Sequence, residues 1–304
     1  MPLRRRQMIA SCAAVALSSS TLLGGSHCFA KENHDRQDLL GLTGVTTGSF
    51  QRNLSPTPVE GKLYLLDLPK ILRDELGMQV LDVMTASFPS MEPAYLDEFR
   101  TRADKAGCVI TNLKMNQPGV DIGSHRFDER KRAIGIYKQS IDAAERLGCR
   151  WVRPLPQSEL PSWDRYVDSY HELIEYAAPK GISLLVENYG WMKGKPDAIP
   201  GLIQAVGAGL AAAPDIGNWT DDARYTGLAK AFPLAVTCDF KAFALDAEGK
   251  HAAYDLKRCF QIGWEAGFRG PWCIEHFHNS LSELFKEMIK LREMIEAWTK
   301  ELSA

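Results

Sequence analysis

Four acidic residues in the second half of the chain each follow a short apolar run. They are Glu187, Asp215, Asp239 and Glu275, which come after Leu-Leu-Val, Ala-Ala-Pro, Val-Thr-Cys and Trp-Cys-Ile. A single acid in such a position is often only a helix cap or the partner of a surface lysine. Four carboxylates that met at one place would repel one another strongly. A divalent cation is the simplest group that would neutralise them.

The regular alternation of short apolar runs with longer amphipathic stretches indicates how these acids are positioned. Eight strands are predicted, at 40–46, 79–84, 108–113, 150–154, 182–187, 210–215, 234–239 and 271–275. Glycines such as Gly107 and Gly148 follow the helical stretches, where a helix must turn into the next strand. Eight strand-helix units predict an α/β fold, the single-domain (β/α)8 TIM barrel, with an open doubly wound sheet as the alternative. No GxGxxG motif follows the first strand, so a dinucleotide site is not predicted.

In a closed barrel the active site forms at the carboxyl ends of the strands, so we expect the four acids to meet there. Further polar candidates surround them. Lys241 comes two residues after Asp239, Arg153 ends the fourth predicted strand, and Lys114 follows the third. The remaining candidates lie in the predicted mouth loops and are Asn188, Trp191, Asn218, His276 and His278.

Four motifs, Val-Glu187-Asn, Asp215-Ile-Gly-Asn218, Asp239-Phe-Lys241 and Ile-Glu275, resemble those of the xylose isomerase-like sugar isomerase and epimerase superfamily. The resemblance runs from about residue 40 to the end. It implies that Glu187, Asp215, Asp239 and Glu275 bind a divalent metal and that the two glutamates act as acid and base. The sequence departs from the pattern at Asp239, where many epimerases have histidine. An all-oxygen site favours Mg²⁺ or Mn²⁺ over Co²⁺ or Zn²⁺.

The resemblance implies an isomerase or epimerase that acts on a sugar, keto-sugar or cyclitol by proton abstraction next to a carbonyl. Catalysis is assigned to Glu187, Glu275 and Lys241, whose positive charge would support an enediolate oxygen. Substrate contacts are assigned to Arg153, Asn188, Trp191, Asn218 and His278. Two alternatives stay open: a lyase or dehydratase that uses the same site on a keto-sugar or keto-inositol, and an inactive carbohydrate-binding barrel.

The first thirty residues have the pattern of a signal peptide. Arg4, Arg5 and Arg6 precede an apolar, charge-free run over residues 8–23, and small residues allow a cut after Ala30. The paired arginines favour the twin-arginine route over ordinary secretion or a retained anchor. We therefore expect residues 1–30 to be removed, 31–39 to be a lead-in, 40–304 to form the barrel, and the protein to be exported to the periplasm or beyond, with no stable membrane span after processing.

The composition of the chain disfavours nucleic acid as a partner. The 304 residues carry a formal net charge of −2 and 24% charged residues, with no basic stripe for a nucleic-acid backbone. A small molecule is the expected partner, and the chain is expected to be a monomer or homodimer. Four cysteines outside the predicted signal peptide, Cys108, Cys149, Cys238 and Cys273, lie in or beside apolar runs and have no CxxC spacing, which indicates core thiols.

Overall fold

Eight parallel strands form one sheet in the order β8-β7-β6-β5-β4-β1-β10-β9. The computed structural model describes residues 38–157, 159–246 and 248–304, so the predicted signal peptide lies outside the described residues. The strands are β1 (Thr43–Thr46), β4 (Val80–Met84), β5 (Val109–Met115), β6 (Trp151–Pro154), β7 (Ser183–Val186), β8 (Leu210–Ala212), β9 (Cys238–Ala242) and β10 (Trp272–His276). Two parallel bridges, Ala212 with Ala235 and Asp215 with Asp239, close the sheet between β8 and β9. The TIM barrel is therefore confirmed.

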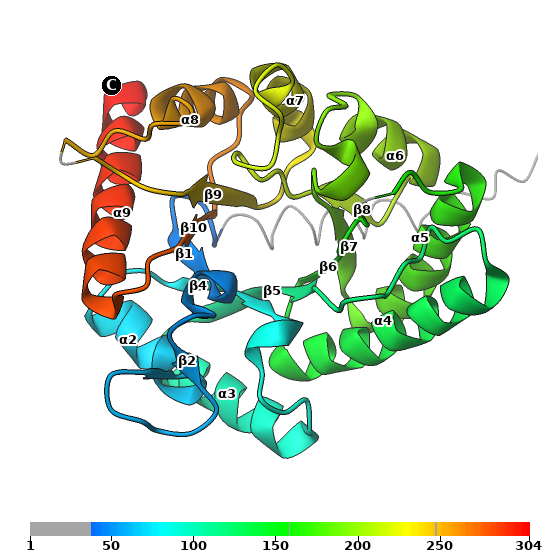
Figure 1. The fold of residues 1–304 in the computed structure, drawn as a ribbon, viewed down its shortest axis with the longest axis horizontal. Coiled ribbons are helices and arrows are strands. Elements are labelled where there is room, and N and C mark those ends of the chain that lie inside the picture. The colour runs from blue at the N-terminus through cyan, green and yellow to red at the C-terminus, as the bar shows by residue number, and fades with distance from the viewer. Residues whose placement is uncertain (1–37, 158, 247) are drawn as a thin grey trace, which may run out of the picture. The chain divides into compact units, whose positions relative to one another are not determined.

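Helices surround the strands on the outside of the barrel (Figure 1). They are α2 (Leu68–Asp74), α3 (Pro93–Ala106), α4 (Phe127–Leu147), α5 (Trp163–Ala177), α6 (Ala198–Val206), α7 (Arg224–Ala231), α8 (Leu256–Glu265) and α9 (Leu281–Ser303). The helices α3 and α4 end at Gly107 and Gly148, whose φ angles of 69° and 75° are left-handed, as the glycine pattern predicts. A short parallel pair, β2 (Leu54–Ser55) and β3 (Leu63–Tyr64), lies in the connection from β1 to α2.

Alternation of side chains along the strands divides the barrel interior into an apolar end and a charged end. A separate apolar cluster joins residues of β4, β6, β7 and β10 with the chain around β8 and β9, and side chains of so many strands meet only inside the barrel. Its members are Leu39, Val80, Trp151, Leu185, Ala213, Val236 and Cys273. Side chains two positions apart on a strand point to the same face. The residues two positions later along the chain from five of these members are Asp82, Arg153, Glu187, Asp215 and Glu275, which lie in a strand or just after its end.

The seventh predicted strand, 234–239, is displaced in the structure, where β9 is Cys238–Ala242. A 3₁₀ helix, Phe232–Leu234, occupies the expected start and contains Pro233, which has no N–H to donate to a sheet. Asp239 and Lys241 consequently lie inside β9, deeper in the barrel than a strand end. Lys114 likewise lies inside β5 and does not follow it.

The five cysteines of the described residues are free and buried, which confirms the prediction of core thiols for Cys108, Cys149, Cys238 and Cys273 and adds Cys259. Within the same residues, no helix is both long and apolar enough to cross a membrane.

Candidate functional site

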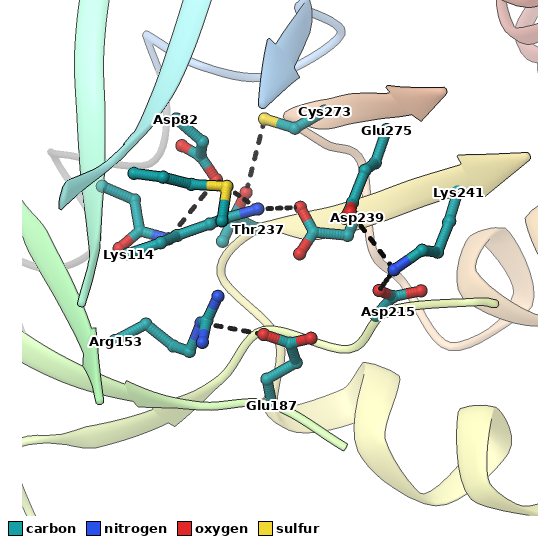
Figure 2. Close-up of polar contacts among 12 residues, drawn as sticks. Asp82, Lys114, Arg153, Glu187, Asp215, Thr237, Asp239, Lys241, Cys273 and Glu275 are labelled. Atoms are coloured by element: carbon teal, nitrogen blue, oxygen red, sulfur yellow. Dashed lines mark hydrogen bonds and ion pairs between the residues drawn. The ribbon is translucent and has the colours of Figure 1, made fainter. Parts of the chain in front are cut away.

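Three carboxylates converge at the charged end of the barrel interior, and we call them the oxygen triad: Glu187, Asp215 and Asp239 (Figure 2). Asp215 and Asp239 are bridge partners, since the Asp239 N–H donates to the Pro214 carbonyl at 2.9 Å. Glu187 directly follows β7, the strand beside β8. One oxygen of each carboxylate lies within 4.8 Å of the other two, and all three residues are buried. Such an arrangement suits a cation that takes oxygen ligands.

Glu275 lies outside the oxygen triad and is joined to it through Lys241. The two residues are register partners on β10 and β9. The Lys241 Nζ lies 3.2 Å from Glu275 Oε1 and 3.1 Å from Asp215 Oδ2. The structure therefore brings three of the four predicted ligands together and places an ammonium group between the fourth and Asp215. The assignment of Glu275 as a ligand stays a prediction.

A second ammonium group, that of Lys114, contacts the oxygen triad from the opposite side. The Lys114 Nζ donates to Asp239 Oδ1 and lies 3.9 Å from Asp82 Oδ2. Asp82 also accepts hydrogen bonds from the Thr111 hydroxyl at 2.5 Å and the Asn112 amide at 3.4 Å. Asp82 was not among the predicted site residues, although an acid inside the apolar run Val-Leu-Asp-Val-Met is a sign of a buried charge.

Arg153 and Glu187 face each other without completing their hydrogen bonds. The Arg153 Nε lies 2.8 Å from Glu187 Oε2, and both side chains are about 95% or more buried. This approach does not have the geometry of a hydrogen bond. Arg153 Nε and Nη1 and Glu187 Oε2 therefore have no hydrogen-bond partner among the described residues. The other oxygen, Oε1, accepts from the Asn218 amide at 2.7 Å. Buried polar atoms are rarely left without partners, so these atoms indicate a place that a ligand completes.

Burial makes the acids of this site hard to ionise. It raises the pKa of Glu187, against the opposing effect of Arg153, and raises the pKa of Asp215 to about 7, against that of Lys241. Burial also raises the pKa of Asp82, although Lys114 acts in the opposite direction. Desolvation of this kind disfavours the charged form of an acid, and a bound cation favours it.

The ammonium groups stay charged. Burial acts to lower the pKa of Lys114, but attraction to Asp239 and Asp82 outweighs it and the pKa rises. The pKa of Lys241 is raised in the same way, because attraction to Asp215 and Glu275 outweighs burial. Together with Arg153 these lysines are paired with five carboxylates. With every group ionised, the site has an excess of two negative charges, which one divalent cation would cancel.

Two asparagines predicted to contact substrate form hydrogen bonds that hold the acids in place. Asn188 is buried and bonds both backbone groups of Asp215, donating to the carbonyl at 2.9 Å and accepting from the N–H at 2.8 Å. Asn218 links Glu187 to Lys241, whose Nζ donates to its Oδ1 at 3.1 Å. Only glycine fits at position 217, because a Cβ there would come within 2.8 Å of the Lys241 side chain. Asn188 and Asn218 are thus positioning residues in this structure, and a contact of either with substrate stays a prediction.

The aromatic and histidine candidates make their contacts elsewhere in the described residues. The ring of Trp191 packs edge-on against Trp163 and Tyr166 at 6.3 Å and 6.2 Å between centroids. His278 Nδ1 accepts from the Ser280 N–H at 2.9 Å. His276 is fully buried, with its ring nitrogens 2.9 Å from the Ala242 carbonyl and 2.5 Å from Glu287. Substrate roles for Trp191 and His278 stay predictions.

The family model described as "Xylose isomerase-like TIM barrel" matches residues 74–301. The chain belongs to this family, which confirms the resemblance carried by the strand-end motifs. Comparison with curated proteins finds no match.

Solved structures with the same fold include an epimerase and a probable dehydratase. One is a xylose isomerase-like TIM barrel protein from Mycobacterium smegmatis in complex with magnesium, 19% identical, with a TM-score of 0.58 over 84% of this chain and 97% of that chain. Another is D-psicose 3-epimerase from Clostridium cellulolyticum with D-tagatose, 13% identical, TM-score 0.59, over 85% and 97%. A third is the probable 3-DHS dehydratase AsbF from Bacillus anthracis, 12% identical, TM-score 0.61, over 82% and 98%. At these identities the likeness shows the fold alone.

Proposed function

We propose that this barrel is a divalent-metal-dependent isomerase or epimerase that acts on a sugar, keto-sugar or cyclitol. The observation that carries the proposal is the oxygen triad, three buried carboxylates whose oxygens lie within 4.8 Å of one another at the charged end of the barrel interior. Family membership and the magnesium complex of the Mycobacterium smegmatis barrel support it.

The residues of the triad fit a hard cation. All three donors are carboxylate oxygens, and Glu187 Oε2 is buried without a hydrogen-bond partner among the described residues. Oxygen donors favour Mg²⁺ or Mn²⁺, with Co²⁺ or Zn²⁺ less favoured. When bound, the cation would polarise a substrate carbonyl and acidify the adjacent C–H.

The protein groups around the triad supply the proton transfer and hold the substrate. Burial raises the pKa of Glu187, which moves this carboxyl toward the range useful for a general base and acid. Glu275 belongs to β10, which β8 and β9 separate from β7, so a second carboxylate can reach the substrate from another direction. Lys241 lies beside Glu275 and adds positive charge where oxygen becomes negative. Arg153 Nε and Nη1 form no hydrogen bond within the described residues, so they are candidate donors for a substrate oxygen.

A lyase or dehydratase with the same residues is the second candidate. If the substrate carries a hydroxyl β to its carbonyl, the carbanion formed by proton removal can expel that hydroxyl before the proton returns. The dehydratase among the similar structures supports this candidate. A third candidate is a barrel that binds sugar without turnover, because Lys114 and Lys241 already neutralise part of the acidic charge.

Deuterium exchange separates the three candidates. The purified protein is incubated in D₂O with Mn²⁺ and a panel of ketoses and keto-glycosides, and proton NMR follows the C–H next to the carbonyl. Exchange with epimeric product in wild type, lost in Glu187→Gln and kept in the surface variant Glu283→Gln, supports isomerase chemistry. Loss of a β-hydroxyl identifies the lyase. Bound sugar with no exchange under any condition contradicts both enzyme proposals.

We also propose that the protein is exported by the twin-arginine route and cut after Ala30. The support is the arginine-rich start and apolar run of residues 1–30. The N-terminal mass of the periplasmic protein tests this, with Arg5→Lys/Arg6→Lys expected to abolish export and Arg4→Lys to leave it unchanged. A mature protein that begins at Met1 contradicts the proposal. A monomer or homodimer is expected, and light scattering after size exclusion measures it.

A further inference from the structure

We propose that Lys114, held by Asp82, is a built-in counter-ion of Asp239 that keeps the metal affinity of the oxygen triad below the value that the carboxylates alone would give. The inference rests on the proposed metal site. It concerns residues that the family motifs do not include, and it assigns a purpose to a buried lysine that the proposed chemistry does not use.

The Lys114 side chain reaches across the barrel interior. In the closed sheet, β5 and β9 are separated by three strands in either direction, so they lie on opposite sides of the barrel. The Lys114 Nζ nevertheless donates to Asp239 Oδ1 (Figure 2). Lys114 and Asp239 are 2% and 3% exposed, so water does not screen this contact. A cation bound by Asp239 would therefore have a fixed positive charge close to it.

Asp82 keeps the ammonium group in the interior. Its Oδ2 lies 3.9 Å from the Lys114 Nζ, and Thr111 and Asn112 fix the carboxylate by hydrogen bonds. Asp82 is outside the oxygen triad. Carboxylates on two sides stabilise the lysine in this position, since a buried charge needs such partners. The cluster thus holds the positive charge in place whether or not a metal is bound.

Lys114 and a bound cation therefore compete for the carboxylate of Asp239. Lys114 occupies Oδ1 of Asp239, which leaves Oδ2 as the oxygen without a hydrogen bond to Lys114. The Lys114 ammonium group, shared with Asp82, offsets part of the charge of Asp239, so a divalent cation at the triad gains less attraction from Asp239 than from an unpaired carboxylate. Removal of the ammonium group frees an oxygen and removes a repulsion in a region of low dielectric.

Calorimetric titration with Mn²⁺ at pH 7.5 tests the inference on the mature protein. Wild type is compared with Lys114→Met, which keeps an unbranched side chain one atom shorter and without charge, and with Lys230→Met, a surface lysine paired with Asp197. We expect Lys114→Met to bind Mn²⁺ about tenfold or more tighter, by the loss of repulsion between close charges. Lys230→Met should match wild type. The melting temperature of metal-free Lys114→Met should fall, because Asp239 and Asp82 lose their partner, and Mn²⁺ should restore it.

A second variant guards against a failure to fold. Asp82→Asn/Lys114→Met removes both charges of the supporting pair, and we expect it to bind Mn²⁺ tighter than wild type by a smaller factor. Equal or weaker binding by a folded variant, with Mn²⁺ still bound by wild type, contradicts the inference and leaves the proposed function standing. No Mn²⁺ binding by wild type or variants contradicts the metal site and the inference together. Mn²⁺ binding by the variants but not by wild type supports the inference most strongly, because the Lys114 charge would then prevent binding in wild type.

Discussion

Glu187 and Asp82 are both buried acids of the barrel interior, and they differ in how far their surroundings satisfy them. Asp82 has hydrogen bonds from Thr111 and Asn112 and an ammonium group at 3.9 Å. Among the described residues, Glu187 has one oxygen without a hydrogen bond, next to an arginine with two nitrogens that also form none. Burial raises the pKa of both acids, so neither burial nor pKa distinguishes them. The unfinished hydrogen bonding indicates which acid awaits a ligand.

The largest effect is expected from breaking the pair at Glu187. Arg153→Met leaves a buried carboxylate without its positive partner, and such a loss costs about 3–5 kcal/mol of unfolding free energy. Urea denaturation of the metal-free protein at pH 8 measures it. Arg153→Met/Glu187→Gln removes both charges and should recover much of the loss. A double variant as unstable as the single one would mean that the arginine acts through packing.

The second largest difference between Glu187 and Asp82 is expected in their effect on metal affinity. Glu187→Gln removes a ligand oxygen and should weaken Mn²⁺ binding by at least about 100-fold, the upper end of what residues behind the ligands cause. Asp82→Asn, a matched acid-to-amide change, should alter the affinity by less than about tenfold. Calorimetric titration of both variants gives the comparison. Equal losses would show that Glu187 and Asp82 do not differ as described.

The raised pKa of Asp215, about 7, predicts two effects of pH. The native carboxyl keeps its proton to a higher pH than the unfolded one, so the stability of the metal-free protein should fall as pH rises from about 4 to about 7 and then level. Mn²⁺ affinity should increase about tenfold per pH unit up to about 7, because the ligand must lose its proton. Thermal melts and titrations at pH 5 to 8 measure both effects. Asp215→Asn should show a flatter stability profile, and an unchanged one would contradict the assignment to this residue.

The smallest effect should come from the partners of Asp82. Thr111→Val removes the hydroxyl that donates to Asp82 at 2.5 Å, which should cost about 1–2 kcal/mol of unfolding free energy. Mn²⁺ affinity should stay within about twofold of wild type, since no atom of the oxygen triad loses a partner. Urea denaturation and titration of the same sample test both statements. A large loss of affinity would mean that the Asp82 side of the barrel also shapes the metal site.

The barrel fold, and the convergence of the acids that follow its later strands, could be predicted from local sequence patterns. Strands alternating with helices determine a parallel barrel, and an acid two positions after an inward apolar residue must point into the interior, as Glu187 after Leu185 does. The position of β9 was not predictable from hydrophobicity, because 234–239 is as apolar as a strand but begins in a 3₁₀ helix. Asp239 therefore lies deeper than a strand-end motif suggests.

The contacts across the barrel could not be predicted. Lys114 and Asp239 are 125 residues apart, and no local pattern pairs a lysine on β5 with an acid on β9. Their pairing gives a physical interpretation of the departure at Asp239 noted in the sequence. The Lys114 ammonium group offsets part of the negative charge that an aspartate adds at the position where the motif resemblance implies a histidine.

The most direct test of the metal site is a crystal structure of the mature protein with Mn²⁺, with data collected at the manganese absorption edge. The account predicts one anomalous peak bonded to oxygens of Glu187, Asp215 and Asp239 at about 2.0–2.2 Å, the usual range for small hard divalent ions. Lys114 should remain on Asp239 in that structure. No peak at the oxygen triad at millimolar Mn²⁺, with Lys114 and Lys241 still on the two aspartates, would contradict the central claim and favour a barrel that neutralises its own acids.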